Sequence, residues 1–335
     1  MIELPEPHVR ETIVGRADVE AQLRASIAAA VISNGWLICG PKGAGKATLA
    51  YRMARAILNP AALAPGETLD MPADARTFRL VGGKAHPDLF VAERSFDEKN
   101  DRYETEVSVE TIRDLGSFLS KTAAGGWRVA IVDTADDLNR NATNALLKSL
   151  EEPPPRTALL LLAERPGQLL ATVRSRCRKI RLRPLADELV VGLLRDAGLS
   201  AADAPAVSAM AQGRPGYALS LASDEGVEAI ALAERFLELV LAGKNAGSLS
   251  PSLTTKAAAG KWGIFLNVLL EKIARAAGRA GRGEAAEGPL IAAGAPALIE
   301  AHEQLAALSG RGEALNLDRG QILSAMGRAL ARAAA

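Results

Sequence analysis

The sequence is poor in cysteine and has no long apolar run. Its 335 residues include two cysteines, Cys39 and Cys177. A structural zinc site normally takes four Cys or His ligands at close spacing, and a disulfide framework needs several pairs. The longest apolar run, residues 158–163, is far shorter than the roughly 20 residues that cross a bilayer. These absences predict a chain without zinc or a membrane span, in the reducing cytoplasm.

Charge of either sign is not in excess. Lys and Arg number 40 and Asp and Glu 39, which gives a formal net charge of +1. This balance excludes a protein that coats nucleic acid by charge alone, although it leaves room for a local basic patch. The N-terminal residues carry no basic-then-apolar signal segment, which agrees with the expected cytoplasmic location.

Short apolar runs alternate with helical patterns in the first half, as in parallel α/β sheets. A helix is expected at 45–58, a second from Val109 and a third at 141–150. Residues 60–85 are expected to be irregular, and the charged stretch 94–106 to be a loop or a hairpin. Buried strands are expected at 36–39, 89–92, 129–132, 158–163 and 177–182.

From Pro184 onwards only helical periods occur. A small helical unit is expected to reach about residue 242, followed by a Gly- and Ser-rich linker at 243–252. Three longer helices are expected near 256–278, 287–309 and 316–333, with breaks at 281–283 and 310–312. We therefore predict an α/β core over residues 1–183, a helical lid over 184–243 and an all-helical domain over 244–335.

A glycine-rich loop follows the first expected strand and opens a helix. It reads Gly-Pro-Lys-Gly-Ala-Gly-Lys-Ala from Gly40 to Ala47. Loops of this spacing cradle phosphate with backbone N–H groups, and the lysine reaches the outer phosphate oxygens. We expect a phosphate loop formed by Gly40, Gly43, Gly45 and Lys46. The next position normally carries a Ser or Thr that binds Mg²⁺, but the methyl group of Ala47 cannot bind a cation.

The other half of such a site is an aspartate at the end of a buried strand, and Asp133 supplies it. Thr134 stands where ATPases place a glutamate that polarises the attacking water. Thr48 follows Ala47 but is turned by about 100° around the helix, which makes it a poor replacement as a metal ligand. Asp133 therefore belongs to a weakened nucleotide site or caps the following turn, and both interpretations stay open.

Several segments resemble one family. Residues 144–154, Asn-Ala-Leu-Leu-Lys-Ser-Leu-Glu-Glu-Pro-Pro, closely resemble a helix of bacterial clamp-loader subunits, and residues 175–177 resemble their Ser-Arg-Cys motif. Together with the loop at 40–46, the His-Pro-Asp at 86–88 and the order of these segments, the chain resembles the delta-prime subunits of the bacterial DNA polymerase III clamp loader. The resemblance is dense over residues 8–183 and only architectural beyond.

The resemblance implies an AAA+ core with a lid and a helical collar, in a hetero-pentameric ring with ATPase subunits and delta. Such a ring opens the sliding clamp and places it on primed DNA during replication. The delta-prime member hydrolyses no ATP and requires no cofactor, but it offers an arginine to a neighbouring ATPase site. By position this arginine finger is Arg176. The other interpretation, that Arg176 pairs with a carboxylate at the start of a strand, stays open.

Further residues that motor subunits use are missing. Gly216, in Gly-Arg-Pro-Gly at 213–216, stands where the motors carry a lid arginine, and Arg214 comes two positions early. No Thr or Asn occurs around Glu164, where the motors sense phosphate. With Ala47 and Thr134, these losses favour a non-hydrolysing subunit. The alternative is an active DNA-dependent AAA+ ATPase subunit; a third candidate, an unrelated phosphate-loop kinase or GTPase, lacks a recognisable acceptor site.

Other features carry weaker predictions. The retained lysine and glycines leave weak ATP or ADP binding open. The 60–106 insertion lacks the four-cysteine zinc module that many relatives carry, and His86 is expected to be structural. Glu151 and Glu152, at a helix end before prolines, are interpreted as solvated or bound to nearby backbone rather than catalytic. The densest basic run either contacts DNA or faces a partner subunit; it comprises Arg174, Arg176, Arg178, Lys179, Arg181 and Arg183.

Overall fold

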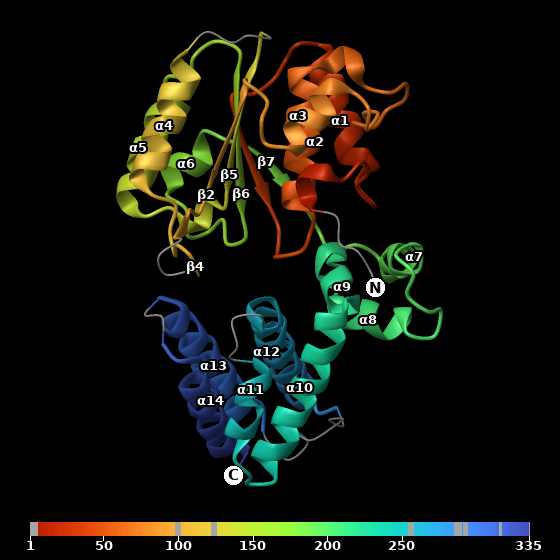
Figure 1. The fold of residues 1–335 in the computed structure, drawn as a ribbon, viewed down its shortest axis with the longest axis vertical. Helices are drawn as coiled ribbons and strands as arrows, with labels where there is room; N and C mark the ends of the chain where they lie inside the picture. The colour runs from red at the N-terminus through yellow and green to blue at the C-terminus, as the bar shows by residue number, and fades with distance from the viewer. Residues whose placement is uncertain are drawn as a thin grey trace. The chain divides into compact units, whose positions relative to one another are not determined.

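Figure 1 shows a computed structural model of the chain, which describes residues 6–97, 102–121, 126–253, 258–284, 290, 294–314 and 317–334. The chain divides into two compact units, one that ends at Leu219 and one that begins at Ser220. No helix of the described residues is both long and apolar enough to cross a membrane.

A five-stranded parallel sheet forms the centre of the first unit. Its inner strands are buried along almost their whole length, because helices cover both faces. The five strands confirm those expected from the apolar runs. In spatial order they are β2 (Leu89–Glu93), β5 (Arg128–Asp133), β6 (Thr157–Ala163), β1 (Gly35–Cys39) and β7 (Arg178–Arg181).

Two layers of helices enclose this sheet (Figure 1). One face carries α1 (Ala17–Ala28), α2 (Lys46–Leu58) and α3 (Arg76–Gly82), and the other carries α4 (Val109–Ser120), α5 (Arg140–Glu151) and α6 (Ala171–Ser175). Because successive strand residues point to opposite faces, Ile38 packs into the core under α2 and Leu37 into the core under α5.

The insertion after α2 is more ordered than its composition predicts. Residues 60–85, expected to be irregular, contain a short 3-10 turn at Pro60–Ala62 and the helix α3. Phe78 and Val81 lie on the buried side of α3, so tertiary packing overrides the Ala, Pro and Gly content. In the stretch 94–106, β3 (Phe96–Asp97) and β4 (Arg102–Tyr103) pair antiparallel, as the hairpin alternative predicted.

Helices make up the rest of the described chain, as expected. The first unit ends with α7 (Asp187–Asp196), α8 (Ala204–Ala211) and the start of α9 (Pro215–Ala222). In the second unit α10 packs against α12 and α14, and α13 packs against both α12 and α14. Its helices are α10 (Asp224–Leu241), α11 (Ser250–Leu253), α12 (Ala259–Gly281), α13 (Ala295–Ala314) and α14 (Arg319–Ala334).

Two details of this half differ from the prediction. The expected linker 243–252 contains a 3-10 turn at Ala246–Leu249 and the start of α11, both packed against α14. The expected break at 310–312 is wrong, because α13 continues through it. Gly312 is instead a contact point, since a side chain there would meet Ile322 of α14. The parallel sheet with its helical extension confirms the fold class, whereas the three-domain boundaries stay a prediction.

Candidate functional site: the phosphate loop and the Arg176 surface

The phosphate loop connects β1 to α2. Gly43 and Gly45 have φ angles of 81° and 94°, a left-handed conformation that side chains other than glycine disfavour. These two residues turn the chain so that α2 begins at Lys46 with its N-terminus at the loop. The turn and the helix N-terminus that a phosphate loop requires are therefore present, and the first turn of α2 directs backbone N–H groups towards the loop.

Lys46 is satisfied within the protein. Its side chain is only 7% exposed, and its Nζ donates to the carbonyl oxygens of Gly40 at 3.0 Å and Pro41 at 3.2 Å. The same Nζ lies 3.4 Å from Oε1 of Glu164. An ammonium has three donors, and all three have acceptors here. The sequence singled out the region of Glu164 only for lacking a phosphate sensor, and did not predict this ion pair.

Glu164 is held in place by a second carboxylate. Oδ2 of Asp136 accepts the backbone N–H of Glu164 at 2.5 Å, and its Oδ1 accepts that of Arg165 at 2.9 Å. These bonds fasten the end of β6 to the turn after β5. The Lys46 ion pair therefore lies at the carboxyl ends of the inner strands β1 and β6, where Asp136 holds the backbone of Glu164.

The magnesium side of the site is impaired. Ala47 lies at the first turn of α2, and Thr48 is buried beneath it. Burial raises the pKa of Asp133 above its usual value, against the opposing effect of Lys46. The Thr134 hydroxyl donates to Oδ2 of Asp137 at 3.2 Å. No hydrogen bond joins the Asp133 side chain to the following turn among the described residues.

The start of α9 lies directly on the phosphate loop. The N–H of Gly216 donates to the carbonyl of Gly43 at 2.8 Å, and a Cβ on Gly43 would lie 2.6 Å from the backbone nitrogen of Tyr217. Arg214 stacks on the Tyr217 ring at 4.2 Å and donates to Ala211. It is therefore engaged within the lid. Ala47 offers no oxygen to Mg²⁺, and Lys46 would have to leave Glu164 to reach a phosphate.

Arg176 directly follows α6 and precedes β7, an edge strand of the sheet. Its NH1 group donates to the Thr172 carbonyl at 3.0 Å, and its NH2 group lies 2.9 Å from Oε1 of Glu151. The side chain is 36% exposed, whereas Cys177 beside it is buried in the core. In the Ser-Arg-Cys motif the cysteine therefore anchors the segment and the arginine faces outward. The carboxylate partner that the alternative interpretation expected is present, and it is compatible with a finger as well.

Several side chains of the basic run 174–183 are engaged in contacts within the chain. Arg174 donates to the carbonyls of Pro166 and Gly167, and Arg178 stacks on Trp36 at 5.0 Å. Lys179 and Arg181 are exposed on β7, an edge strand of the sheet. His86 accepts a hydrogen bond from the backbone N–H of Asp88 at Nδ1, in keeping with a structural role in its turn.

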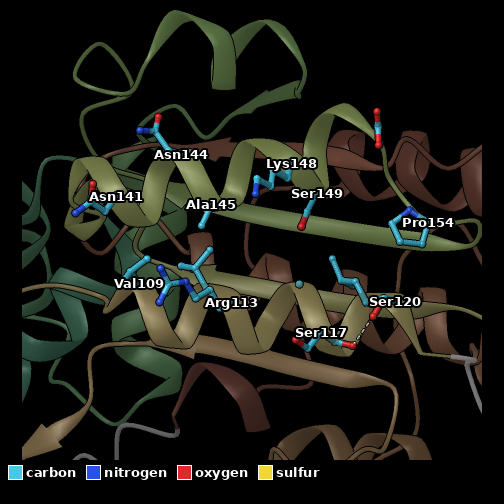
Figure 2. Close-up of a pocket in the computed structure, with 14 residues that line it drawn as sticks. Val109, Arg113, Ser117, Ser120, Asn141, Asn144, Ala145, Lys148, Ser149 and Pro154 are labelled. Atoms are coloured by element: carbon cyan, nitrogen blue, oxygen red, sulfur yellow. Dashed lines mark hydrogen bonds between the residues drawn. The ribbon is translucent and has the colours of Figure 1, made fainter.

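A groove between α4 and α5 has no counterpart in the sequence predictions (Figure 2). It encloses about 940 Å³, and Arg113, Asn144 and Lys148 are among its lining residues. Both helices are recognisable from their periodicity, but their side-by-side packing joins segments about 30 residues apart in the chain and follows only from the tertiary structure.

Fold and loop together define an α/β protein with a phosphate loop between the first strand of its parallel sheet and the following helix. A family model described as DNA polymerase III, delta subunit, matches residues 15–186, just over half of the chain. The chain belongs to this family.

Curated relatives agree with this assignment. DNA polymerase III subunit delta-prime of Pseudomonas aeruginosa is 38% identical over 146 residues, which are 43% of this chain and 42% of that protein. The Escherichia coli subunit of the same name is 34% identical over 148 residues, 44% of this chain and 42% of that protein. The chain thus matches less than half of the length of either relative. A DNA polymerase III gamma subunit-related structure from Thermotoga maritima covers 94% of this chain and 100% of its own, at 14% identity and a TM-score of 0.45, too distant to carry an argument.

Proposed function

We propose that this chain is a delta-prime-type subunit of a bacterial clamp loader, which completes the ring and donates Arg176 to the ATP site of a neighbouring subunit. The observation that carries the proposal is a contrast between two sites. The lysine of the phosphate loop is paired with a carboxylate of the same chain. Arg176, which lies elsewhere in the α/β core, is oriented by its contacts and exposed.

An arginine suits this role for a physical reason. A guanidinium is permanently charged and presents five N–H donors in a planar fork, so it can neutralise charge that develops on a transferring phosphoryl group. Two of the five donors of Arg176 are engaged with Thr172 and Glu151. Three remain for phosphate oxygens of a partner.

No nucleotide is required by this chain in the proposed role. The Gly43–Gly216 hydrogen bond holds the lid on the loop directly, and Glu164 supplies the anion for Lys46. An active ATPase, the alternative, would need a metal ligand at Ala47 and a group that activates water at Thr134. Neither side chain provides one.

The partners follow from the same role. We propose a hetero-pentameric ring with ATPase subunits and delta, located in the cytoplasm, with the sliding clamp and primer–template DNA bound through the assembled ring. The names of the relatives, DNA polymerase III subunit delta-prime, support membership of this machinery. The helices α10 to α14 are the proposed collar.

Reconstitution of the loader from its own subunits, with clamp and primed DNA, tests the role. We expect Arg176→Ala to lower the steady-state ATPase several-fold while gel filtration shows an intact ring, and Arg176→Lys to restore little because the planar fork is lost. Lys46→Ala in this chain should leave the ATPase unchanged. Wild-type turnover by the Arg176→Ala loader, or ATP turnover by the isolated chain that Lys46→Ala abolishes, would refute the proposal.

A further inference from the structure

We propose that Glu151 is a positioning residue for Arg176, which presents the guanidinium to the neighbouring subunit in a defined orientation. This inference rests on the finger role proposed above. It assigns a task to one of the two carboxylates that end α5, neither of which the phosphate-loop chemistry uses.

The ion pair joins two segments that are separate in the chain. Glu151 is the last residue of α5, and Arg176 is the residue that follows α6. Two contacts hold the guanidinium from different sides: the Glu151 carboxylate at NH2, 2.9 Å away, and the Thr172 carbonyl at NH1, 3.0 Å away. Because the side chain is also anchored at its Cα, contacts at two nitrogen atoms restrict rotation of the guanidinium, so the remaining N–H donors have a defined direction.

The backbone beneath Arg176 is fixed as well. Its N–H donates to the Val173 carbonyl at 3.2 Å, and the adjacent Cys177 is buried in the core. The orientation of the side chain therefore depends on its own contacts with Glu151 and Thr172. An arginine side chain loses much rotational freedom when it is held in one geometry, and a contact that imposes this geometry in advance lowers the cost of reaching the transition state.

A carboxylate at Glu151 does not stabilise α5 by itself. Glu151 lies at the C-terminal end of the helix, where the helix dipole disfavours negative charge. The ion pair with Arg176 supplies the compensation. Glu152, one residue later, instead lines the groove between α4 and α5. The two neighbouring carboxylates thus point to different surroundings, and Glu152 is a matched control for Glu151.

The ion pair is also exposed enough to adapt when a phosphate arrives. Arg176 is 36% exposed and Glu151 46% exposed. Exposed pairs of this kind are weak and are screened by salt, so Glu151 orients the arginine without retaining it against a polyanion. The expected effect of removing the carboxylate is a loss of about twofold to fivefold in turnover, the range that a weak exposed pair supplies.

The test uses the reconstituted loader with clamp and primed DNA, in variants Glu151→Ala, Glu151→Gln and Glu152→Ala. We expect Glu151→Ala to lower kcat by about twofold to fivefold with the KM for ATP unchanged, because the finger acts on the transition state. Glu151→Gln, which keeps one acceptor oxygen but no charge, should lie between Glu151→Ala and the wild type. The kcat of Glu152→Ala should equal that of the wild type. The difference in kcat between Glu151→Ala and the wild type should decrease as the salt concentration rises.

A double-mutant cycle separates positioning from a structural effect. In an Arg176→Ala background, Glu151→Ala should cause no further loss, since no guanidinium remains to be oriented. Further loss in that background, wild-type kcat for Glu151→Ala, or a gain in kcat on its removal would each overturn the inference. If Arg176→Ala itself has no effect, the proposed function fails. If Arg176→Ala lowers turnover and Glu151→Ala does not, only the positioning role fails.

Discussion

Nζ of Lys46 lies 3.4 Å from the carboxylate of Glu164, so the lysine of the phosphate loop has a counter-ion within its own chain. In a nucleotide-binding loop this ammonium is directed at phosphate oxygens. Here it is neutralised by a residue that follows β6, and the two carbonyl oxygens of Gly40 and Pro41 take its other donors.

Removal of this counter-ion should expose the loop to nucleotide. We expect Glu164→Gln to bind ATP about fivefold to tenfold more tightly than the wild type, because a charge-assisted contact to Lys46 no longer competes with phosphate. A fluorescent ATP analogue measures the affinity by titration. The double variant Glu164→Gln with Lys46→Ala should lose the gain. Equal affinity of Glu164→Gln and wild type would show that Glu164 does not occupy the lysine.

The contact of Gly43 with the lid should be sensitive to a single added carbon. Gly43→Ala places a Cβ 2.6 Å from the Tyr217 nitrogen, at a residue whose φ is 81°. We expect this variant to lower the free energy of unfolding of the first unit by about 2 kcal/mol or more. Gly198→Ala is the control, because Gly198 has a φ of 97° and open space around it. Urea denaturation measures the free energy of unfolding of both variants. An equal loss for the two would mean that the contact between Gly43 and Tyr217 contributes nothing to stability.

Arg52, on the helix that follows the phosphate loop, bridges two carboxylates. Its Nε donates to Glu20 and its NH2 to Asp70, each at 2.7 Å, and Glu20 is almost fully buried. Arg52→Met leaves the Glu20 charge buried and unpaired, so we expect a loss of about 3 to 5 kcal/mol in the free energy of unfolding.

A second substitution tests that explanation of Arg52. Glu20→Leu in the Arg52→Met background should recover part of the stability, since the unpaired charge is then removed. Arg113→Ala, which breaks an exposed pair with Glu110, should cost about 0.5 kcal/mol or less. Thermal or urea unfolding of the three variants measures these differences. No recovery in the double variant would point to lost packing rather than lost charge.

The buried thiol of Cys177, beside Arg176, should be unreactive at neutral pH. Burial raises the pKa of Cys177 to about 11. Because the thiolate is the reactive form, about one molecule in a thousand carries it at pH 8. Iodoacetamide labelling of the native chain, read by mass spectrometry, should be slow at pH 8 and accelerate as pH rises. Labelling in denaturant sets the unprotected rate, and a native rate equal to it would contradict the burial of Cys177.

Much of the α/β core could be predicted from the sequence. The apolar runs ending at Cys39, Asp133 and Ala163 each became a strand, because a strand buried on both faces must be apolar throughout. Helix α3 could not be predicted from composition, since its apolar residues gain stability only when α2 lies beside them. The expected break at 310–312 was wrong for a similar reason. Ile322 packs closely against Gly312, and this contact favours a glycine inside α13.

By itself the sequence determined which chemistry is missing. Ala47 has no oxygen for a metal, Thr134 has no carboxylate for a water, and Gly216 has no charge for a phosphate, in any conformation of the chain. Only the tertiary structure decided which groups of the chain contact Lys46 and the phosphate loop. It brings Glu164 to Lys46 from 118 residues away and Gly216 to Gly43 across the lid. It also pairs Arg176 with Glu151. Such contacts depend on the register of parallel strands and on helix packing, which no local pattern specifies.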